Sequence, residues 1–270
     1  MRYKKLAIHS VPRSGSSWLG QLINSSPHVM YKYQPLFSYA LKGFLDERAS
    51  YARIQLFFEQ LQTTEDRFMD QVREIEAGKA PAFAKKDLRV VAYKEVRYHH
   101  ILKNLLAQDP NIMVIGLVRN PLAVINSWLR APREFRKDQG WSELEEWRWA
   151  YAKNEGKKEE FYGYEKWKEV ALMFEQLQRD YPQRFRLLWY ADLLNQTEAI
   201  VEQLFAMLEL PLTEQTMSFI RESKSQTVDD PYAVYREKRT DDQWKKELPE
   251  IIQEAILTDL RNTSLEKYID

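Results

Sequence analysis

Short apolar stretches alternate along the chain with longer segments whose apolar residues recur at helical spacing. Four stretches rich in β-branched and aromatic residues are interpreted as buried strands, at residues 5–11, 89–96, 112–119 and 184–193. Helical patterns such as ARIQLFFEQLQ, HILKNLLAQ and VALMFEQLQRDY separate them. This alternation predicts an α/β fold in which helices flank a mainly parallel central sheet. In such folds, ligands bind beyond the carboxyl ends of the strands.

The length of 270 residues allows one large domain or two small ones. Because no internal repeat, low-complexity tract or Pro/Ser-rich linker interrupts the chain, we expect a single domain over residues 1–270. A mostly helical segment at about 36–80 is expected to form a lid beside the first loop. An insert at about 129–168 is rich in aromatic and charged residues.

Composition excludes several classes of function. Forty basic residues balance forty acidic ones, so we expect no binding to nucleic acid or to an anionic membrane surface. The lack of cysteine excludes disulfides and Cys-ligated metals, and four histidines are too badly spaced for a metal site, so no metal is expected. The apolar run in MRYKKLAIHS is too short for a signal peptide or a membrane span. We therefore expect a cytoplasmic protein.

The segment VPRSGSSWLG, residues 11–20, joins the first predicted strand to a helical pattern. Gly15 allows a tight turn and a close approach by an anion. Ser16 and Ser17 fall in the first helical turn, where free backbone N–H groups and the positive helix end favour negative charge. Arg13 adds a planar donor fork suited to phosphate or sulfate. The alternative is a structural turn with capping serines, and this segment alone leaves both interpretations open.

A second predicted strand end, in VIGLVRNPLAVINSW, carries Arg119. Asn120 is suited to cap the following helix and Pro121 to its first position. Ser127 lies about two turns into this helix, on the face where the helix began. Arg119 and Ser127 could therefore bind one oxyanion. Taken alone, the pattern is better explained by a capped helix with a solvated arginine.

Together these two segments resemble the sulfotransferases that use 3′-phosphoadenosine 5′-phosphosulfate (PAPS) and release adenosine 3′,5′-bisphosphate (PAP). VRNPLAVINSW is similar to their 3′-phosphate element, which implies that Arg119 and Ser127 bind that group. The resemblance covers most of the chain, and the motifs are most similar to those of carbohydrate-type members. It implies a P-loop-like α/β sulfotransferase fold with helical inserts. PRSGSSW is similar to the family's loop for the 5′-phosphosulfate, which implies cofactor-binding roles for Arg13, Ser14, Gly15, Ser16, Ser17 and Trp18.

Two later segments extend the resemblance. LLWYADLLNQTEAIVEQLFAMLELPL is similar to the family's late strand and helix, which implies that Tyr190 lies near the adenine. YREKRTDDQWKKEL resembles the basic segment that closes over the 3′-phosphate, with Lys238 and Arg239 as the matching residues. The glycine that usually follows the basic pair is absent here. The alternative for this segment is an ordinary solvated run of charges.

Sulfuryl transfer builds charge on the leaving phosphate oxygen and on the sulfonate, so positioned cations should supply most of the catalysis. Arg13 is the first candidate for the bridging oxygen. The resemblance places Lys94 at the transferred group, and KEVR resembles a Lys-x-x-Arg step that brings Arg97 to the substrate. Strand alternation sends Lys94 and Arg97 to opposite faces. Both can serve only if the strand stops or bulges near Val96; otherwise Arg97 is a surface charge.

The acceptor hydroxyl also needs a proton acceptor. The family places a glutamate in segments like YxxEPLF or a histidine two residues after the strand lysine, and this chain has Gln34 and Val96 at those positions. Gln34 can position a hydroxyl but cannot act as a base at neutral pH. The candidates just beyond Lys94 are Glu95, expected to be ionised near neutral pH, His99 and His100, and Glu95 and then His99 are preferred. An ion-pair role for Glu95, a capping role for His99, and a protein that needs no base are the alternatives.

Trp141, beside Gly140 in an expected loop, is the candidate for contact with an acceptor, and Arg133, Arg136 and Lys137 could hold an acidic one. A saccharide acceptor is favoured by resemblance, with tyrosyl, lipid and other small-molecule hydroxyls open. A P-loop kinase is disfavoured because no GK[ST] ending and no evident strand-end aspartate for magnesium is present. A nucleotide-binding or sensor protein without efficient transfer is the third hypothesis.

Overall fold

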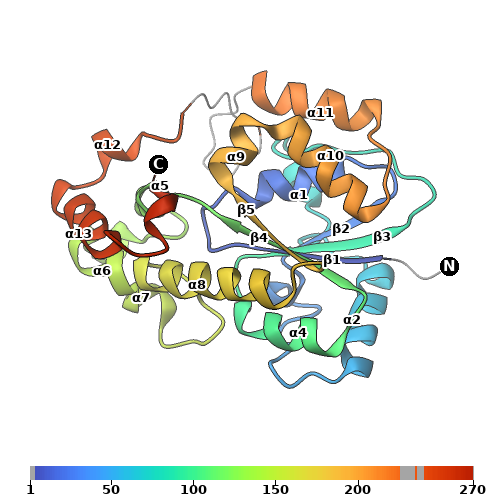
Figure 1. Cartoon of the computed structure of the whole chain (residues 1–270), viewed down its shortest axis with the longest axis horizontal. Helices are drawn as coiled ribbons and strands as arrows, with labels where there is room; N and C mark the ends of the chain where they lie inside the picture. Colours follow the sequence, from blue (N-terminus) through green and yellow to red (C-terminus); the bar gives the residue numbers. More distant parts are fainter. Residues whose placement is uncertain (1–3, 226–234, 236–239, 270) are drawn as a thin grey trace.

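A computed structural model of the chain contains one sheet of five parallel strands in the order β2-β3-β1-β4-β5 (Figure 1). The structure describes residues 4–225, 235 and 240–269. All four strand pairs are parallel, which confirms the predicted α/β architecture. The strands are β1 (Lys4–His9), β2 (Val29–Tyr33), β3 (Val90–Glu95), β4 (Ile112–Val118) and β5 (Phe185–Trp189).

Four of these strands overlap the four predicted ones, and β2 is the strand that the prediction lacks. Its sequence, VMYKY, is short and mixed in polarity, and it pairs only with β3 at the edge of the sheet. The last predicted strand extends too far: residues 190–195 form helix α9 (Tyr190–Asn195) instead. The reason is that Trp189 pairs with Val118, the last residue of β4, so no neighbouring strand remains beyond it.

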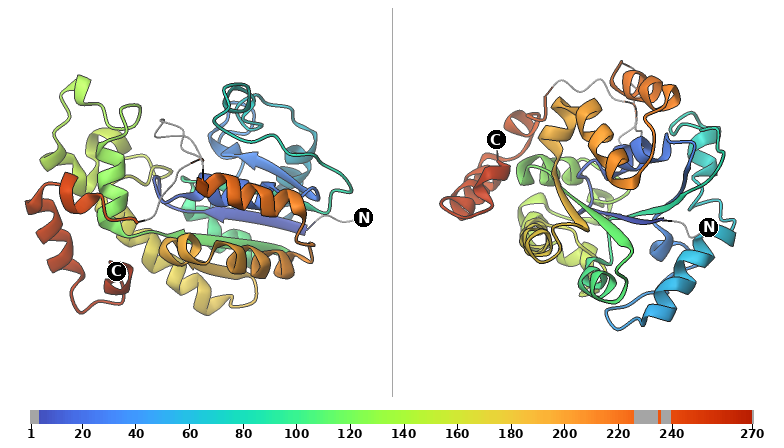
Figure 2. Two further views of the ribbon diagram at one scale, coloured as in Figure 1. Left: turned by 90° about the horizontal axis from the view of Figure 1, so that it is seen from above. Right: turned by 45° about the vertical axis from the view of Figure 1, so that its right-hand side comes forward.

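Helices cover both faces of the sheet (Figures 1 and 2). Because side chains alternate along a strand, Leu6 and Ile8 enter one apolar core while Ala7 enters the other. The first core contains residues of α1 (Ser16–Asn24), α10 (Thr197–Leu208) and α11 (Glu214–Ser225). The second contains residues of α2 (Tyr51–Thr63), α4 (Leu102–Gln108), α5 (Pro121–Leu129), α8 (Tyr164–Asp180), α12 (Trp244–Glu247) and α13 (Glu250–Leu260).

The segment expected to form a lid contains η1 (Pro35–Phe37), α2 and α3 (Val72–Glu76). Helix α2 buries Ile54, Phe57, Phe58 and Leu61, so much of this segment belongs to the second core. The aromatic and charged insert contains α6 (Glu143–Trp149) and α7 (Tyr151–Asn154) before α8 begins. Among the described residues, none of the helices combines the length and the apolar character needed to cross a membrane.

Candidate active site

The turn between β1 and α1 has an unusual backbone. Arg13 has φ 70° and Gly15 has φ 87°, both in the left-handed region. A Cβ atom at Gly15 would lie 2.4 Å from the Tyr190 ring, so a side chain there would displace the ring. Helix α1 begins at Ser16, and its free N–H groups therefore lie at this turn. The turn has the form of an anion-binding loop.

The two strand-end segments meet at this turn. Arg13 Nε donates a hydrogen bond to Ser127 Oγ at 3.2 Å, and Arg119 Nη1 donates to the Arg13 carbonyl oxygen at 2.5 Å. Ser127 lies on α5, which begins with Pro121 and is capped by Asn120 as predicted. Parallel strands therefore bring the ends of β1 and β4 into direct contact, although they are far apart in sequence.

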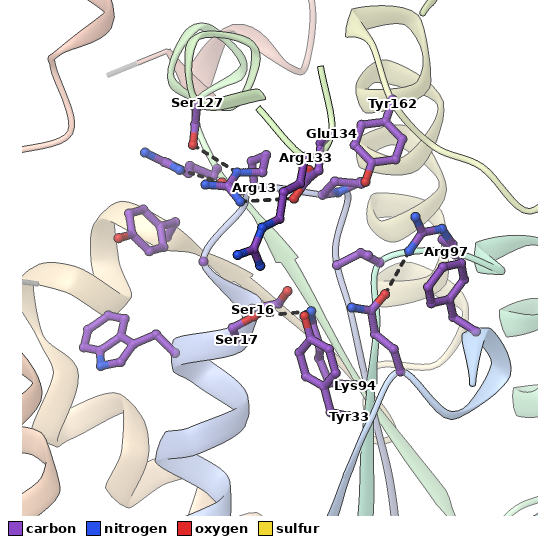
Figure 3. Close-up of a pocket in the computed structure, with 18 of the residues that line it drawn as sticks. Arg13, Ser16, Ser17, Tyr33, Lys94, Arg97, Ser127, Arg133, Glu134 and Tyr162 are labelled. Carbon is purple, nitrogen blue, oxygen red and sulfur yellow. Dashed lines mark hydrogen bonds and ion pairs between the residues drawn. The ribbon is translucent and has the colours of Figure 1, made fainter. Parts of the chain in front are cut away.

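A cavity of about 360 Å³ opens where these segments meet (Figure 3). Both arginines and the glycine turn open onto it rather than onto separate surfaces. The predicted site residues that line the cavity are Arg13, Gly15, Ser16, Ser17, Trp18, Gln34, Lys94, Arg97, Arg119, Ser127 and Tyr190. Ser14, Glu95, His99 and Trp141 do not line it. Lys238 and Arg239 lie outside the described residues.

Lys94 is buried at the wall of the cavity. Its Nζ lies 3.4 Å from Ser17 Oγ and 4.5 Å from the centre of the Tyr33 ring (Figure 3). Burial lowers the pKa of Lys94 from 10.5 to about 7. An anion bound beside Nζ would favour the charged ammonium and reverse that shift.

Strand β3 ends at Glu95, and the chain bends at Val96 and Arg97. Because the strand ends here, the side chains of Lys94 and Arg97 can face the same side. Both residues line the cavity. Arg97 Nη1 donates to Gln34 Oε1 at 3.0 Å, and its Nε lies 2.9 Å from each carboxylate oxygen of Glu160. Two partners thus hold the Arg97 guanidinium in place.

Glu95 lies on the other side of β3 and is completely buried. Its Oε1 accepts a hydrogen bond from the Leu36 N–H at 2.7 Å. Burial raises the pKa of Glu95 to about 8, so the carboxyl group is protonated at neutral pH. This corrects the expectation of an ionised side chain. A protonated group outside the cavity lining is poorly suited to accept a proton from a bound acceptor.

His99 is also completely buried and away from the cavity lining. Its Nδ1 lies 3.0 Å from His9 Nδ1, and its ring centre lies 4.4 Å from that of Phe161. Burial lowers the pKa of His99 well below its usual value. His99 stands at the start of η2 (His99–Ile101), as expected, but its contacts are those of a core residue.

The aromatic lining of the cavity differs from the prediction. Trp141 packs against the Phe135 ring, with ring centres 5.8 Å apart, instead of facing the cavity. Tyr33, Phe37 and Tyr162 supply the aromatic surface near Lys94 and Arg97. Charged residues of the insert, Arg133, Glu134 and Lys153, complete this side. Arg133, one of three cations expected to hold an acidic acceptor, thus lines the cavity, whereas Arg136 and Lys137 do not. Nothing in the sequence pattern separates Glu134 and Lys153 from their neighbours.

Arg119 has a second strong contact besides the one to Arg13. Its Nε and Nη2 lie 2.7 and 2.5 Å from the two carboxylate oxygens of Asp241. Tyr190 lies under the guanidinium, with its ring centre 5.0 Å from Cζ. The carboxylate therefore occupies the planar donor fork that suits a phosphate. Sequence reasoning did not single out Asp241, which lies within the segment YREKRTDDQWKKEL, two residues after Arg239.

Cations and N–H donors thus surround one cavity and make it suited to a ligand with two separated anionic groups. Within the described part of the chain, no group of three or more His, Cys, Asp or Glu residues could hold a metal ion.

Comparison with solved structures places the fold among known enzymes. Mouse sulfotransferase SULT7A1 complexed with PAP is 14% identical over 100% of this chain and 89% of that chain, with a TM-score of 0.57. Retinol dehydratase in a complex with retinol and PAP is 14% identical, covers 98% of this chain and 83% of that chain, and has a TM-score of 0.55. The sulfotransferase domain of the Synechococcus PCC 7002 olefin synthase is 18% identical over 95% of this chain and 93% of that chain, with a TM-score of 0.52. These likenesses concern the fold.

A search of curated proteins gives no match. The family model described as "Sulfotransferase domain" matches residues 4–258, which span both strand-end segments and nearly all described elements. The chain therefore belongs to the sulfotransferase family of enzymes.

Proposed function

We propose that the protein transfers the sulfuryl group of PAPS to a hydroxyl acceptor, with a carbohydrate hydroxyl as the favoured acceptor class. The observation that carries this proposal is the contact of Arg13 with Ser127, because it joins two anion-binding segments into one cavity. A nucleotide with a 3′-phosphate and a 5′-phosphosulfate has two anionic groups that match two such segments.

The residues divide between the two ends of the donor. The turn at Gly15 and the first turn of α1 bind the 5′-phosphosulfate, and Arg119 and Ser127 bind the 3′-phosphate. Tyr190 and Trp18 are edge to face, with ring centres 6.4 Å apart, and offer aromatic surface to the adenine. Two of the similar structures are complexes with PAP, which supports PAPS as the donor for this chain.

At the transferred group, this chain contributes fixed positive charge. Arg13 faces the oxygen that bridges phosphorus and sulfur, and Lys94 faces the sulfonate oxygens. Negative charge grows on these oxygens in the transition state, and a cation already in position stabilises it without reorganisation. Gln34 and Arg97, held to each other at 3.0 Å, position the acceptor.

The acceptor side of the cavity combines aromatic rings with hydrogen-bonding groups. Phe37 lies against the Arg97 guanidinium, 4.0 Å from Cζ to the ring centre, and Tyr33 and Tyr162 line the same region. Sugar rings pack their C–H faces on aromatic side chains while their hydroxyls bind polar groups, so a saccharide suits this surface. Tyrosyl, lipid and small-molecule hydroxyls are the competing acceptors.

Thermal unfolding with PAP, ADP and ATP, each with and without magnesium, tests the donor class. PAP should raise the midpoint more than either of the others. Stabilisation by ATP with magnesium alone would overturn the proposal.

A screen with radiolabelled PAPS against a methyl glycoside, p-nitrophenol, a tyrosyl peptide and a long-chain alcohol then tests transfer. Stabilisation by PAP without transfer to any of them, or to water, supports the nucleotide-binding alternative.

A further inference from the structure

The proposed transfer needs a proton acceptor, and neither Glu95 nor His99 lines the cavity. Glu134 is the one carboxylate among the described residues that do, and no histidine is among them. Other basic atoms at the wall belong to Arg and Lys side chains, whose charged forms the anionic donor favours. Among the residues that line the cavity, Glu134 is therefore the side chain best suited to accept a proton.

The backbone around Glu134 is held firmly at the cavity. Glu134 and Phe135 both donate their N–H groups to the Ala131 carbonyl oxygen, at 2.9 and 2.8 Å. The Phe135 ring is buried against Trp128 of α5, with ring centres 5.3 Å apart and planes at 88°. The turn after α5 thus directs Glu134 back toward Ser127 and the donor site.

The two carboxylate oxygens of Glu134 have different surroundings. Oε1 accepts a hydrogen bond from Arg13 Nη1 at 3.2 Å (Figure 3). Oε2 is buried and accepts no hydrogen bond within 3.5 Å from the described residues, although the Tyr162 hydroxyl lies close enough to interact with this carboxylate. A buried carboxylate oxygen without a close donor is unfavourable, so this carboxylate is suited to receive a hydrogen bond from a ligand or from the Tyr162 hydroxyl.

The neighbours of Glu134 place it on the acceptor side of the cavity. In Figure 3 it lies between Arg13 and Tyr162. Burial raises the pKa of the Tyr162 hydroxyl, and the negative charge of Glu134 adds to that rise. The same charge acts on Lys94, in opposition to the burial that lowers the lysine pKa. Glu134 is therefore close both to the cation assigned to the sulfonate and to the aromatic acceptor surface.

We propose that Glu134 is the catalytic base of this enzyme, an inference that rests on the proposed function. The acceptor oxygen forms a bond to sulfur while the bond between sulfur and the bridging phosphate oxygen breaks. The electron pair of that bond leaves with PAP, and the acceptor proton moves to the Glu134 carboxylate. Because Oε1 holds Arg13, one ion pair sets the distance between the base and the cation at the leaving oxygen.

Glu134→Gln tests this assignment, with the acceptor found in the radiolabel screen or, failing one, with water and release of labelled sulfate. We expect kcat to fall about 100- to 10,000-fold, the usual effect of general base catalysis, with KM for PAPS little changed. Glu134→Asp should recover part of the lost rate. The pH profile of kcat should differ between the wild type and the Gln variant, because an amide cannot accept the proton.

Glu145→Gln, on the exposed side of α6, is the matched control and should retain wild-type activity. If the wild type transfers sulfate and the folded Glu134→Gln variant is equally active, the base assignment alone is overturned. The same holds if the pH profile of kcat is the same in the wild type and in this variant. If Glu134→Gln does not fold, a Glu134→Asp variant that folds with wild-type kcat and an unshifted pH profile also overturns it. A wild-type protein that binds PAP yet transfers sulfate to nothing, water included, overturns the proposed function and the base assignment with it.

Discussion

Arg119 is bound at two points by Asp241, with its Nε and Nη2 at 2.7 and 2.5 Å from the carboxylate oxygens. Both side chains are largely buried, with 9% and 17% exposed. A planar carboxylate on a planar guanidinium uses the same donor pair that a phosphate would use. A 3′-phosphate bound to Arg119 as proposed would therefore have to compete with the carboxylate of Asp241 for this arginine.

Asp241→Asn should strengthen PAP binding. The amide keeps the shape of the side chain but removes the charge that competes with the phosphate, so we expect about a tenfold lower Kd, or about 1.4 kcal/mol. Isothermal titration with PAP measures it. Asp242→Asn is the matched control, because Asp242 is bound by Thr240 rather than by Arg119. Weaker binding in the Asp241 variant would show that the carboxylate orients Arg119 instead of competing with the ligand.

Arg13 and Ser127 touch each other but should affect different kinetic constants. Arg13→Ala should lower kcat about 100- to 1,000-fold while much of the affinity for PAP remains, because its charge acts on the leaving oxygen. Ser127→Ala should mainly weaken PAP binding, because a hydroxyl to the 3′-phosphate acts equally in ground and transition states. Steady-state kinetics and titration with PAP separate the two effects. The reverse pattern would mean that the two roles are exchanged.

Much of this site could be predicted because its chemistry is local in sequence. A glycine turn, a helix start and an arginine each stand within a few residues of a strand end. Parallel pairing of β1 and β4 then brings two such ends together without further information. The contact between Arg13 and Ser127 follows from that topology.

The rest depends on burial and tertiary packing, which sequence patterns do not record. Glu95 differs from an ordinary glutamate only because the fold buries it. Glu134 stands in a run of charges, and its neighbours Arg136 and Lys137 pair with Asp138 and Glu143 at the surface instead. Nothing in that run indicates which charge turns inward. Strand β2 was missed for a related reason, since one partner at the sheet edge stabilises a weak pattern.

Gly15→Ala should abolish PAP binding and destabilise the fold. The substitution incurs about 1–2 kcal/mol for a left-handed alanine and also forces a methyl group against the Tyr190 ring. Gly140→Ala is a matched control, since Gly140 has φ 81° but no atom within 4 Å of an added Cβ. Urea unfolding and PAP titration should show a small stability loss in the control with normal binding. Equal behaviour of both variants would contradict a close packing role for Tyr190.

PAP binding should weaken as the pH rises from about 7.5 to about 9. In the free protein, burial lowers the pKa of Lys94 to about 7, so the amine is largely neutral in this range. A bound anion favours the ammonium, so binding takes up a proton and the affinity falls by up to about tenfold per pH unit. Titration in two buffers of different ionisation enthalpy measures the uptake. Lys94→Arg should bind with little pH dependence, and an equal dependence in this variant would exclude Lys94 as the source.

The buried His9–His99 pair should make the fold sensitive to mild acid. Burial lowers the pKa of His9 from 6.5 to about 3 and that of His99 well below its usual value. The unfolded chain therefore binds more protons below about pH 6.5, and the free energy of unfolding should fall there by up to about 1.4 kcal/mol per pH unit for each histidine. Urea unfolding at about pH 7.5, 6.5 and 5.5 measures this slope. Glu95, whose pKa burial raises to about 8, opposes this slope by a similar amount, so His9→Gln should remove most of the net slope. An unchanged slope would assign the acid sensitivity to other groups.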